Sequence, residues 1–265
     1  MTTLTAYIEG IGLLGPGLTD WPSSQPILTG QQAYHSQQTI LPPPELLASA
    51  ERRRSGAAVK LTLATGLEAV TAAGVDATTL PSVFSASGGD GDNCHAICEM
   101  LASDDRQISP TRFHNSVHNA PSGYWSIATG SMTPASVLSG YDASFGAGLL
   151  EAMTQVVIDN TRTILLACDT RYPEPLNSAR PISDALGISL VLSPEQTNKA
   201  LAKITISLTD ASAHQMNNAE LEHLRTSIPA ARGLPLLQGV AMQKTTQVIL
   251  DYLGNTRIAV DIIPC

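Results

Sequence analysis

The chain has 265 residues, of which 43% are hydrophobic, so it is long enough to bury a sizeable core and is not globally disordered. Only 14% of the residues are charged, and 15 Lys and Arg against 23 Asp and Glu give a formal net charge of −8. This acidic balance argues against a protein that binds nucleic acid or an anionic membrane surface.

The basic residues are unevenly distributed. No Lys or Arg occurs between Arg112 and Arg162, a stretch of mostly apolar and small residues. Charged residues are depleted in protein cores and at the centres of interfaces. We therefore expect residues 113–161 to be buried, either in the core or against a partner subunit.

The sequence shows no signal peptide, no membrane-spanning segment and no disulfide framework. Its first residues lack the basic and apolar regions of a signal peptide. No run approaches the roughly 18 apolar residues of a membrane-spanning helix, and four irregularly spaced cysteines are too few for a disulfide framework. These features predict a cytoplasmic protein with no membrane span.

The predicted elements alternate between strands and helices. A strand over 4–9 runs into a glycine-rich turn, and a strong helix over 55–73 has apolar residues at helical spacing, with Gly74 as its C-cap. Further helices are expected over 45–50, 92–102, part of 114–129 (which Pro121 and Gly123 interrupt), 145–158 and 220–227. Further strands are expected over 82–85, 136–138, 162–168, 188–192 and 204–208, then a hairpin of 246–252 and 257–263 about Gly254-Asn255. This order predicts one α/β domain with a mixed or largely parallel sheet.

One glycine motif follows the first strand. Gly10-Ile-Gly12-Leu-Leu-Gly15 matches the dinucleotide fingerprint G-x-G-x-x-G. A phosphate site needs a helix that starts within the glycine turn, whereas Pro16-Gly17 follows here. We interpret the motif as a turn at a strand end, and a Rossmann-type nucleotide-binding protein remains an alternative.

The histidines and cysteines do not form a recognisable metal motif. Cys94, His95, Cys98, His114 and His118 lack Cys-x-x-Cys or His-Glu-x-x-His spacing. No G-x-S-x-G elbow occurs. We therefore predict no metal and no cofactor.

Several segments, in their order along residues 4–210, resemble the β-ketoacyl synthase family, whose fold is the thiolase fold. The matching segments are Tyr7-Ile-Glu-Gly-Ile-Gly, Trp21 with Leu28-Thr-Gly30, the arginine-led helix 52–70, Val83-Phe-Ser-Ala-Ser-Gly-Gly89, 108–130 and Leu186-Gly-Ile-Ser-Leu-Val-Leu192. The resemblance implies a truncated, layered thiolase-like α/β fold with a mixed sheet. It further implies a single domain over 1–265, in which 1–210 resembles the N-terminal half of a ketosynthase and 211–265 is a reduced C-terminal remnant.

The sequence departs from the family at its catalytic residues. The resemblance matches Asp142-Ala143-Ser144-Phe145 to the Cys-Ala-Ser/Thr-Gly turn that holds the family's nucleophilic cysteine. A cysteine at a helix N-terminus attacks thioesters as a thiolate, whereas the helix dipole stabilises a carboxylate there and leaves it unreactive. The glycine-rich motifs of the family's two histidines are also absent, and the setting of His214 does not match them. The resemblance therefore implies no catalytic residue and no condensation by this chain alone.

A ketosynthase-like chain without this chemistry resembles a chain length factor, although full-length members of that group carry Gln where Asp142 stands. The run 113–125 is similar to the ketosynthase-like N-terminal-domain family, which includes members of bacterial aryl polyene clusters. The resemblance implies a heteromer with a full-length β-ketoacyl synthase, indirect contact with acyl carrier protein, and a role in polyene, polyketide or fatty-acid-like synthesis. The implied interface or tunnel residues are Phe113, His114, Asn115, His118, Asn119, Tyr124, Trp125, Val137 and Phe145.

An enzymatic alternative also remains open. Asp142 could act with a histidine such as His118 in a hydrolase or acyltransferase, because carboxylate and imidazole pairs carry acid–base chemistry.

Overall fold

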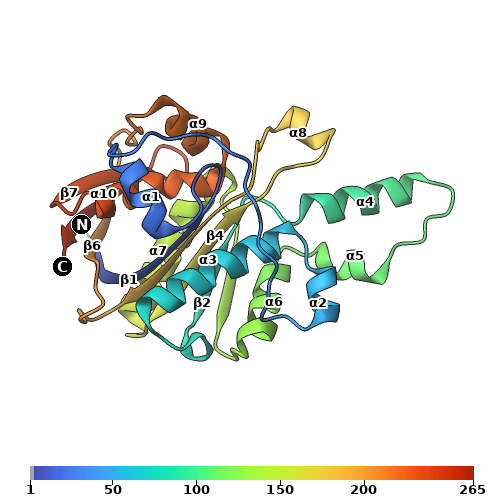
Figure 1. Cartoon of the computed structure of the whole chain (residues 1–265), viewed down its shortest axis with the longest axis horizontal. Coiled ribbons are helices and arrows are strands. Elements are labelled where there is room, and N and C mark those ends of the chain that lie inside the picture. Colours follow the sequence, from blue (N-terminus) through green and yellow to red (C-terminus); the bar gives the residue numbers. More distant parts are fainter. Residues whose placement is uncertain (1–2) are drawn as a thin grey trace.

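The computed structural model describes residues 3–265, and its centre within that range is an eight-stranded sheet (Figure 1). The strand order is β3-β2-β4-β5-β1-β6-β8-β7. The strands are β1 (Leu4–Leu14), β2 (Ser82–Ser85), β3 (Ala135–Leu138), β4 (Thr163–Asp169), β5 (Leu186–Ser193), β6 (Ala202–Thr209), β7 (Thr246–Asp251) and β8 (Arg257–Pro264).

The sheet is mixed, as expected, but it is not largely parallel. β2 pairs in parallel with β3 and β4, and every other pair in the sheet described here is antiparallel. Parallel neighbours need long crossover connections, usually helical. The connections from β2 to β3 and from β3 to β4 contain such helices, whereas β7 and β8 are joined by a tight hairpin at Gly254.

The helices lie on both faces of the sheet. They are α1 (Trp21–Leu28), α2 (Ser49–Arg54), α3 (Ala57–Ala73), α4 (Gly91–Ala102), α5 (Pro110–Asn115), α6 (Ala120–Thr129), α7 (Ser144–Ile158), α8 (Leu176–Ala179), α9 (Ala219–Ser227) and α10 (Leu234–Ala241), with 3-10 turns η1 (Ala77–Thr79), η2 (Tyr141–Ala143) and η3 (Pro229–Gly233). Leu165 packs in the core cluster of α7, and its neighbours Ile164 and Leu166 pack in that of α3. Because successive side chains of a strand point to opposite faces, α3 and α7 cover the two sides of the sheet. No helix within 3–265 has the length and apolar character needed to cross a membrane.

Several boundaries differ from the sequence-based expectation. The helix expected at 45–50 lies at Ser49–Arg54, because Arg52 donates to the carbonyls of Glu45 and Leu47 and fixes that segment as a turn. Pro121 does not interrupt a helix but lies in the first turn of α6, where its missing N–H costs nothing. Helices α1 and α10 were not expected from the sequence, because α1 contains two prolines and α10 contains one and is apolar over most of its length.

The prediction of a glycine turn after residue 9 is wrong, because β1 continues through these glycines to Leu14. Gly10 and Gly12 lie inside the strand, directly beneath α3. A Cβ on Gly10 would overlap the carbonyl oxygen of Ala69, and one on Gly12 would overlap that of Thr65. The motif therefore serves close packing of a helix on a strand, and it does not form the phosphate-binding turn of a nucleotide-binding protein.

Gly12→Ala tests this packing. We expect it to lower the free energy of unfolding by about 1–3 kcal/mol or more, because the added methyl group meets backbone that cannot move away. The matched control is Gly123→Ala in α6, where nothing lies within 4 Å of an added Cβ. That control should be neutral or stabilising by about 0.5–1 kcal/mol. Urea unfolding of both variants provides the measurement, and equal effects would contradict the packing role.

Candidate functional site

The three parallel strands, β2, β3 and β4, have their carboxyl ends together at one end of the sheet. Ser87 follows β2, Asp142 follows β3 and Asp169 ends β4. In open α/β sheets, ligands bind outside the carboxyl ends of such strands. The region at these strand ends is therefore the candidate site, and it contains Asp142, the residue that the sequence analysis singled out.

Asp142 lies in η2, immediately before α7. Its Oδ1 accepts a hydrogen bond of 2.6 Å from Nη2 of Arg180, and its Oδ2 lies 3.7 Å from Nη2 of Arg232. The guanidinium of Arg180 also lies 3.6 Å from the ring centre of Tyr141, which has a left-handed φ of 55°. Two arginines and the turn before α7 thus hold the carboxylate in place.

The ion pairs continue away from Asp142. Arg232 is 3.1 Å from Asp251, which accepts a 2.6 Å hydrogen bond from Arg225. Arg225 also binds Glu222 at 2.7 Å. This hydrogen bond raises the pKa of Arg225 and lowers the pKa of Glu222. This network of alternating negative and positive side chains connects η2 to η3, β7 and α9.

Asp169 is a second anchor of the site. Its buried carboxylate accepts hydrogen bonds from N and Oγ of Ser87, at 2.8 and 2.5 Å, and from N of Ala230, at 2.9 Å. Burial raises its pKa to about 6, although the hydrogen bonds from Ser87 and Ala230 oppose that shift. Asp169 therefore joins the loop after β2 to η3.

The recorded ion pairs and hydrogen bonds of the Asp142 side chain, within residues 3–265, are with arginines and not with a thiol or an imidazole. His118 lies with Nε2 3.3 Å from the carbonyl oxygen of Ala86, and Nδ1 of His214 accepts from N of Ile249 at 2.9 Å. A general base must be within hydrogen-bond reach of its partner. The geometry thus gives no support to a hydrolase that uses Asp142 with His118.

Cys168 is likewise not a usable nucleophile. It lies next to Asp169, and burial raises its pKa to about 12. A thiol reacts as its thiolate, so this side chain is inert at neutral pH.

The nine residues implied for an interface or tunnel fall into three groups by burial. Asn115, Tyr124, Trp125 and Phe145 are buried in this chain's own core, whereas Phe113, His114 and Asn119 are exposed, and His118 and Val137 are partly buried. The hydroxyl of Tyr124 donates to Oδ1 of Asn115, and the ring of Trp125 packs over Gly66. Sequence alone did not separate these groups, because aromatic residues dominate cores and interfaces alike.

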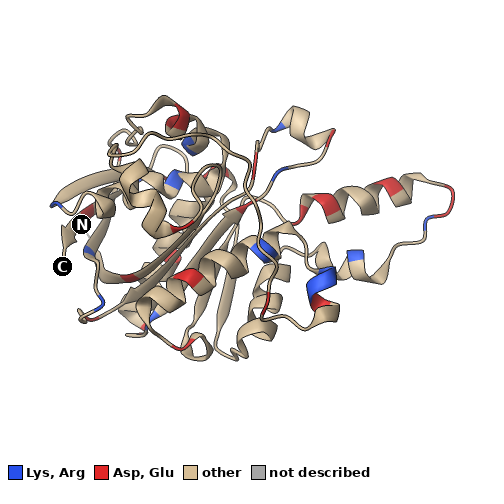
Figure 2. Cartoon of the chain, in the orientation of Figure 1, with Lys and Arg blue, Asp and Glu red and all other residues tan. Residues whose placement is uncertain are grey.

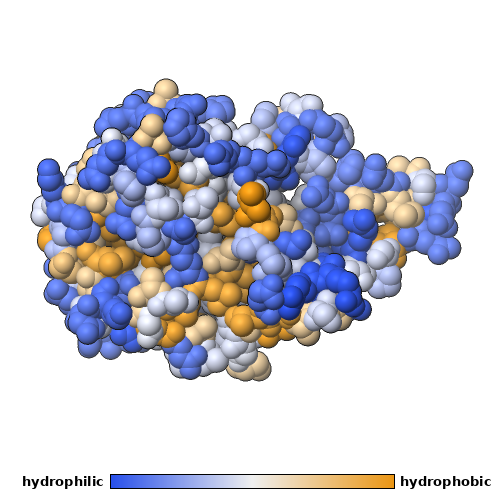
Figure 3. All heavy atoms as spheres, in the orientation of Figure 1, coloured by the Kyte–Doolittle hydropathy of each residue, from blue (hydrophilic) through white to orange (hydrophobic). Residues whose placement is uncertain are grey.

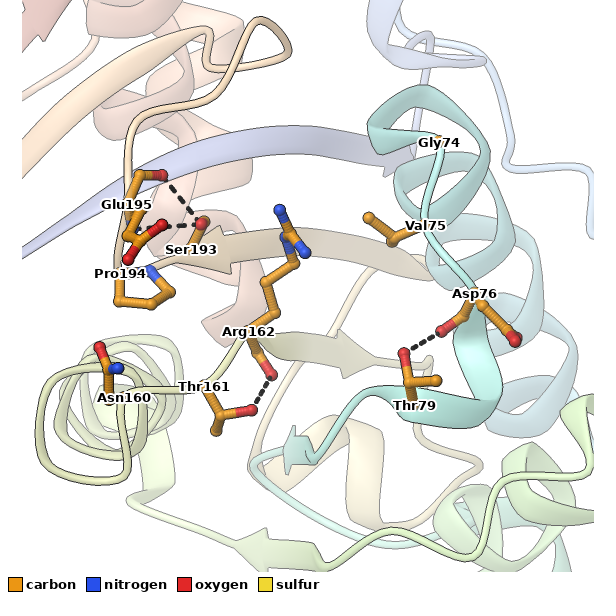
Figure 4. Close-up of a pocket in the computed structure, with 10 residues that line it drawn as sticks. All are labelled: Gly74, Val75, Asp76, Thr79, Asn160, Thr161, Arg162, Ser193, Pro194 and Glu195. Atoms are coloured by element: carbon orange, nitrogen blue, oxygen red, sulfur yellow. Dashed lines mark hydrogen bonds between the residues drawn. The ribbon is translucent and has the colours of Figure 1, made fainter.

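A polar cavity of about 570 Å³ lies away from this site, near the start of β4 (Figure 4). Arg162 points into it, and its Nε donates to the buried Glu9 at 2.6 Å. Asp76 and Glu195 also line the cavity, so acids outnumber bases there. No group of three or more potential metal ligands occurs within residues 3–265.

The arginines and acids around Asp142 escaped the sequence analysis. Arg180, Arg232 and Asp251 come from segments far apart in the chain, and none belongs to a motif. No signal in the sequence pointed to them, because charged residues in loops without a motif are ordinarily solvated surface.

The raised pKa of Asp169 predicts a pH dependence of stability. Its stabilising contribution is fully present below about pH 4, where the carboxyl is protonated in both states. It is lost as the pH rises to about 6. We expect this contribution to fall by about 3 kcal/mol across that window. Urea unfolding at a series of pH values, compared between the wild type and Asp169→Asn, isolates it, and a difference that does not vary with pH would contradict the assignment.

The comparisons with known proteins agree with the fold. One chain of the ketosynthase (ApeO) in complex with its chain length factor (ApeC) from Xenorhabdus doucetiae superposes with a TM-score of 0.75 at 18% identity, over 97% of this chain and 99% of that one. The type II PKS complex AntDE:AntF gives 0.75 at 11% identity, covering 100% of both chains. The ishigamide ketosynthase/chain length factor gives 0.73 at 11% identity, over 98% and 99%. No curated protein sequence matches.

The likeness to these ketosynthase structures confirms the expected thiolase-like α/β fold. Residues 26–248, most of the chain, match the β-ketoacyl synthase N-terminal domain. The chain therefore belongs to the β-ketoacyl synthase family.

Proposed function

We propose that this chain is a non-catalytic, chain-length-factor-like subunit. It would pair with an active β-ketoacyl synthase and help shape the acyl tunnel of that complex, in polyene, polyketide or fatty-acid-like synthesis. The observation that carries this proposal is the binding of Asp142 by Arg180 and Arg232. The sequence resemblance matches Asp142 to the family's nucleophilic cysteine.

Such a carboxylate is poorly suited to attack a thioester. Its lone pairs are engaged by guanidinium groups, which stabilise the negative charge and reduce its nucleophilicity. Within the described residues its ion-pair and hydrogen-bond partners are arginines and not an imidazole, and arginine does not exchange a proton near neutral pH. A structural role for Asp142 explains these contacts better than a catalytic one.

Two of the similar structures are of a ketosynthase together with a chain length factor. We transfer that pairing to this chain as part of the proposal. The shared fold supports it, because two chains of one fold can pair through equivalent surfaces.

The open edge of the sheet offers a surface for pairing. β3 is the last strand on its side, and the carbonyls of Pro134 and Leu138 accept from N of Ser82 and of Ala86. Since backbone groups alternate in direction along a strand, Ala135 and Val137 turn theirs toward the open side. Exposed edges of this kind are usually covered by another chain or by a protective feature.

Apolar side chains surround this edge. Phe113, Ile127, Met132 and Tyr141 are exposed by 64%, 58%, 95% and 61%, and no Lys or Arg lies among residues 113–161. A cavity of about 510 Å³ beside α5 and α6 is lined by Phe113, among others. An apolar surface with no cations at its centre is typical of an obligate interface.

We expect the isolated chain not to condense acyl and malonyl thioesters. In a complex with a ketosynthase, Asp142→Asn should leave the condensation rate within about twofold, because it keeps the shape and one acceptor for Arg180 and only removes a charge. Product formation from labelled malonyl thioester measures this rate. Condensation by the isolated chain that Asp142→Asn abolishes would contradict the proposal.

The open edge of β3 can be tested with Ala135→Pro. This change removes an outward N–H at the first position of the strand and leaves the bonds to β2 intact. We expect it to weaken co-purification with the ketosynthase without lowering the melting temperature. Ala135→Ser keeps the N–H and serves as control. Undiminished co-purification of the proline variant would exclude this edge from the interface.

A role in chain length predicts different outcomes for exposed and buried aromatics. Phe113→Ala should change the length of the product while the complex survives, because the ring is exposed beside the cavity. Tyr124→Ala should instead lower the free energy of unfolding by about 3–5 kcal/mol, as for any large core residue. Mass spectrometry of products measures the first effect, and unchanged length with Phe113→Ala would exclude this role.

A further inference from the structure

The polar cavity of about 570 Å³ near the start of β4 lies at the opposite end of the parallel strands from Asp142 (Figure 4). Its walls are the turn after α3, residues 160–162 before β4 and the turn after β5. Small-molecule sites are cavities of about 300–1,000 Å³ in which a few polar groups converge. This cavity, here called the Arg162 cavity, has the size of such a site, and the proposed function gives it no role.

A buried carboxylate holds Arg162 in this cavity. Nε of Arg162 donates to Oε2 of Glu9 at 2.6 Å, and Nη2 donates to Oε1 at 3.4 Å. The Glu9 side chain is 1% exposed, and its Oε1 also accepts from Oγ1 of Thr197 at 2.6 Å. A carboxylate buried to this extent needs such partners, because an unpaired charge is costly in a protein interior. These contacts fix the guanidinium in one orientation.

The second edge of this guanidinium is available to a ligand. A guanidinium carries its N–H donors in a planar fork, and such a fork binds a carboxylate through two parallel hydrogen bonds. Glu9 occupies the edge formed by Nε and Nη2, whereas Nη1 has no acceptor within residues 3–265. The Arg162 side chain is 41% exposed, and Figure 4 shows it reaching into the cavity. A carboxylate in the cavity can therefore bind the Nη1–Nη2 edge while Glu9 stays bound.

Two acids line the same cavity. Asp76 and Glu195 lie on opposite sides of Arg162 in Figure 4. Within the described residues, Glu195 forms its hydrogen bonds through its backbone N and O, and Asp76 uses Oδ1 to accept from N of Thr78. The Glu195 carboxylate and Oδ2 of Asp76 are thus open to a cation. A ligand with negative charge alone would be repelled by these acids.

Two helix ends add to the negative potential. α3 ends at its C-cap Gly74, which lines the cavity, and α7 ends at its C-cap Asp159, next to the lining residue Asn160. Helix C-termini favour positive charge. A second base, Lys199, stands at the rim, since its Cε lies 3.7 Å from the place of a Cβ on Gly74. Figure 2 shows acidic and basic residues together at this end of α3, and Figure 3 shows hydrophilic residues at the lower left, where the loop after β5 lies. The cavity therefore suits a ligand that carries both a carboxylate and a positive charge.

We propose that the Arg162 cavity binds a free α-amino acid with an uncharged polar side chain. The carboxylate of the ligand lies against the Nη1–Nη2 edge of Arg162, and its ammonium group faces the acids and the helix ends. The other polar side chains of the lining are hydroxyls and one amide, those of Thr79, Asn160, Thr161 and Ser193. They suit a neutral polar side chain such as that of glutamine. The site is separate from the proposed function, because it needs no partner subunit.

Calorimetric titration of the full chain with L-glutamine tests the site. We expect saturable binding with a Kd below about 1 mM. The α-amide of L-glutamine lacks the carboxylate, and N-acetyl-L-glutamine lacks the ammonium group. Each should bind at least about tenfold more weakly, because each loses one charge-assisted contact. Absence of saturable binding of L-glutamine, or equal binding of either analogue, would overturn the inference.

Variants of the cavity locate the binding. Arg162→Lys keeps a positive charge beside Glu9 but removes the two-pronged edge, so the Kd for L-glutamine should rise by at least about tenfold. Glu195→Gln changes an exposed side chain, and it should raise the Kd by about threefold without changing the melting temperature. The matched control is Glu220→Gln on α9, which lies away from the cavity and should leave the Kd unchanged (Figure 1).

The two cavity variants answer different objections. Arg162→Lys also alters the contact with Glu9, so its melting temperature is measured beside its Kd. Glu195 has no such structural contact through its side chain within the described residues, so a change in Kd there reports on the ligand. An unchanged Kd in Glu195→Gln and Arg162→Lys alike would place the binding elsewhere and overturn the inference. Co-purification with a ketosynthase should be the same for both variants and the wild type, so failure here leaves the proposed function standing.

Discussion

The close approach of α3 to the sheet is the constraint on which the rest of the structure depends. Gly10 and Gly12 of β1 and Gly187 of β5 all lie beneath this helix, where a side chain would meet its backbone or Leu61 and Thr65. The contact fixes α3 across the antiparallel strands at the centre of the sheet, next to β4. The position of β4 then sets where β2 and β3 end, and so where Asp142 and Asp169 stand.

The charged side chains at those strand ends form a network of ion pairs. The ion-pair network that runs from Asp142 through Arg232 and Asp251 to Arg225 alternates negative and positive side chains. Each partly buried charge therefore has a neighbour of opposite sign. Removing one partner of such a pair leaves an uncompensated charge, which costs more than the pair contributes. Under the proposed function, this network keeps the shape of a ketosynthase site in a chain that no longer needs its reactivity.

Local residue patterns predicted most helices and strands, but they did not predict contacts between residues far apart in the sequence. Helical spacing and Gly74 gave α3, and the strand at Ser82–Ser85 has the expected bounds. The end of β1 was missed, because a glycine in a sequence does not reveal whether a turn or a helix lies against it. Arg180 reaches Asp142 across 38 positions from a loop without a motif, so only the tertiary fold shows that the two residues meet.

The two edges of the sheet are treated differently, and this asymmetry bears on how the chain assembles. On the outer side of β7, the backbone N–H of His214 donates to the carbonyl of Ile249. The backbone N–H of Ile249 in turn donates to Nδ1 of the His214 ring. That edge is thus partly closed by the chain's own loop, whereas β3 leaves the groups of Ala135 and Val137 open. A sheet with two open edges can add strands indefinitely. Because the edge of β7 is partly closed, the open edge of β3 is the more available of the two for pairing with another chain, as the proposed function requires.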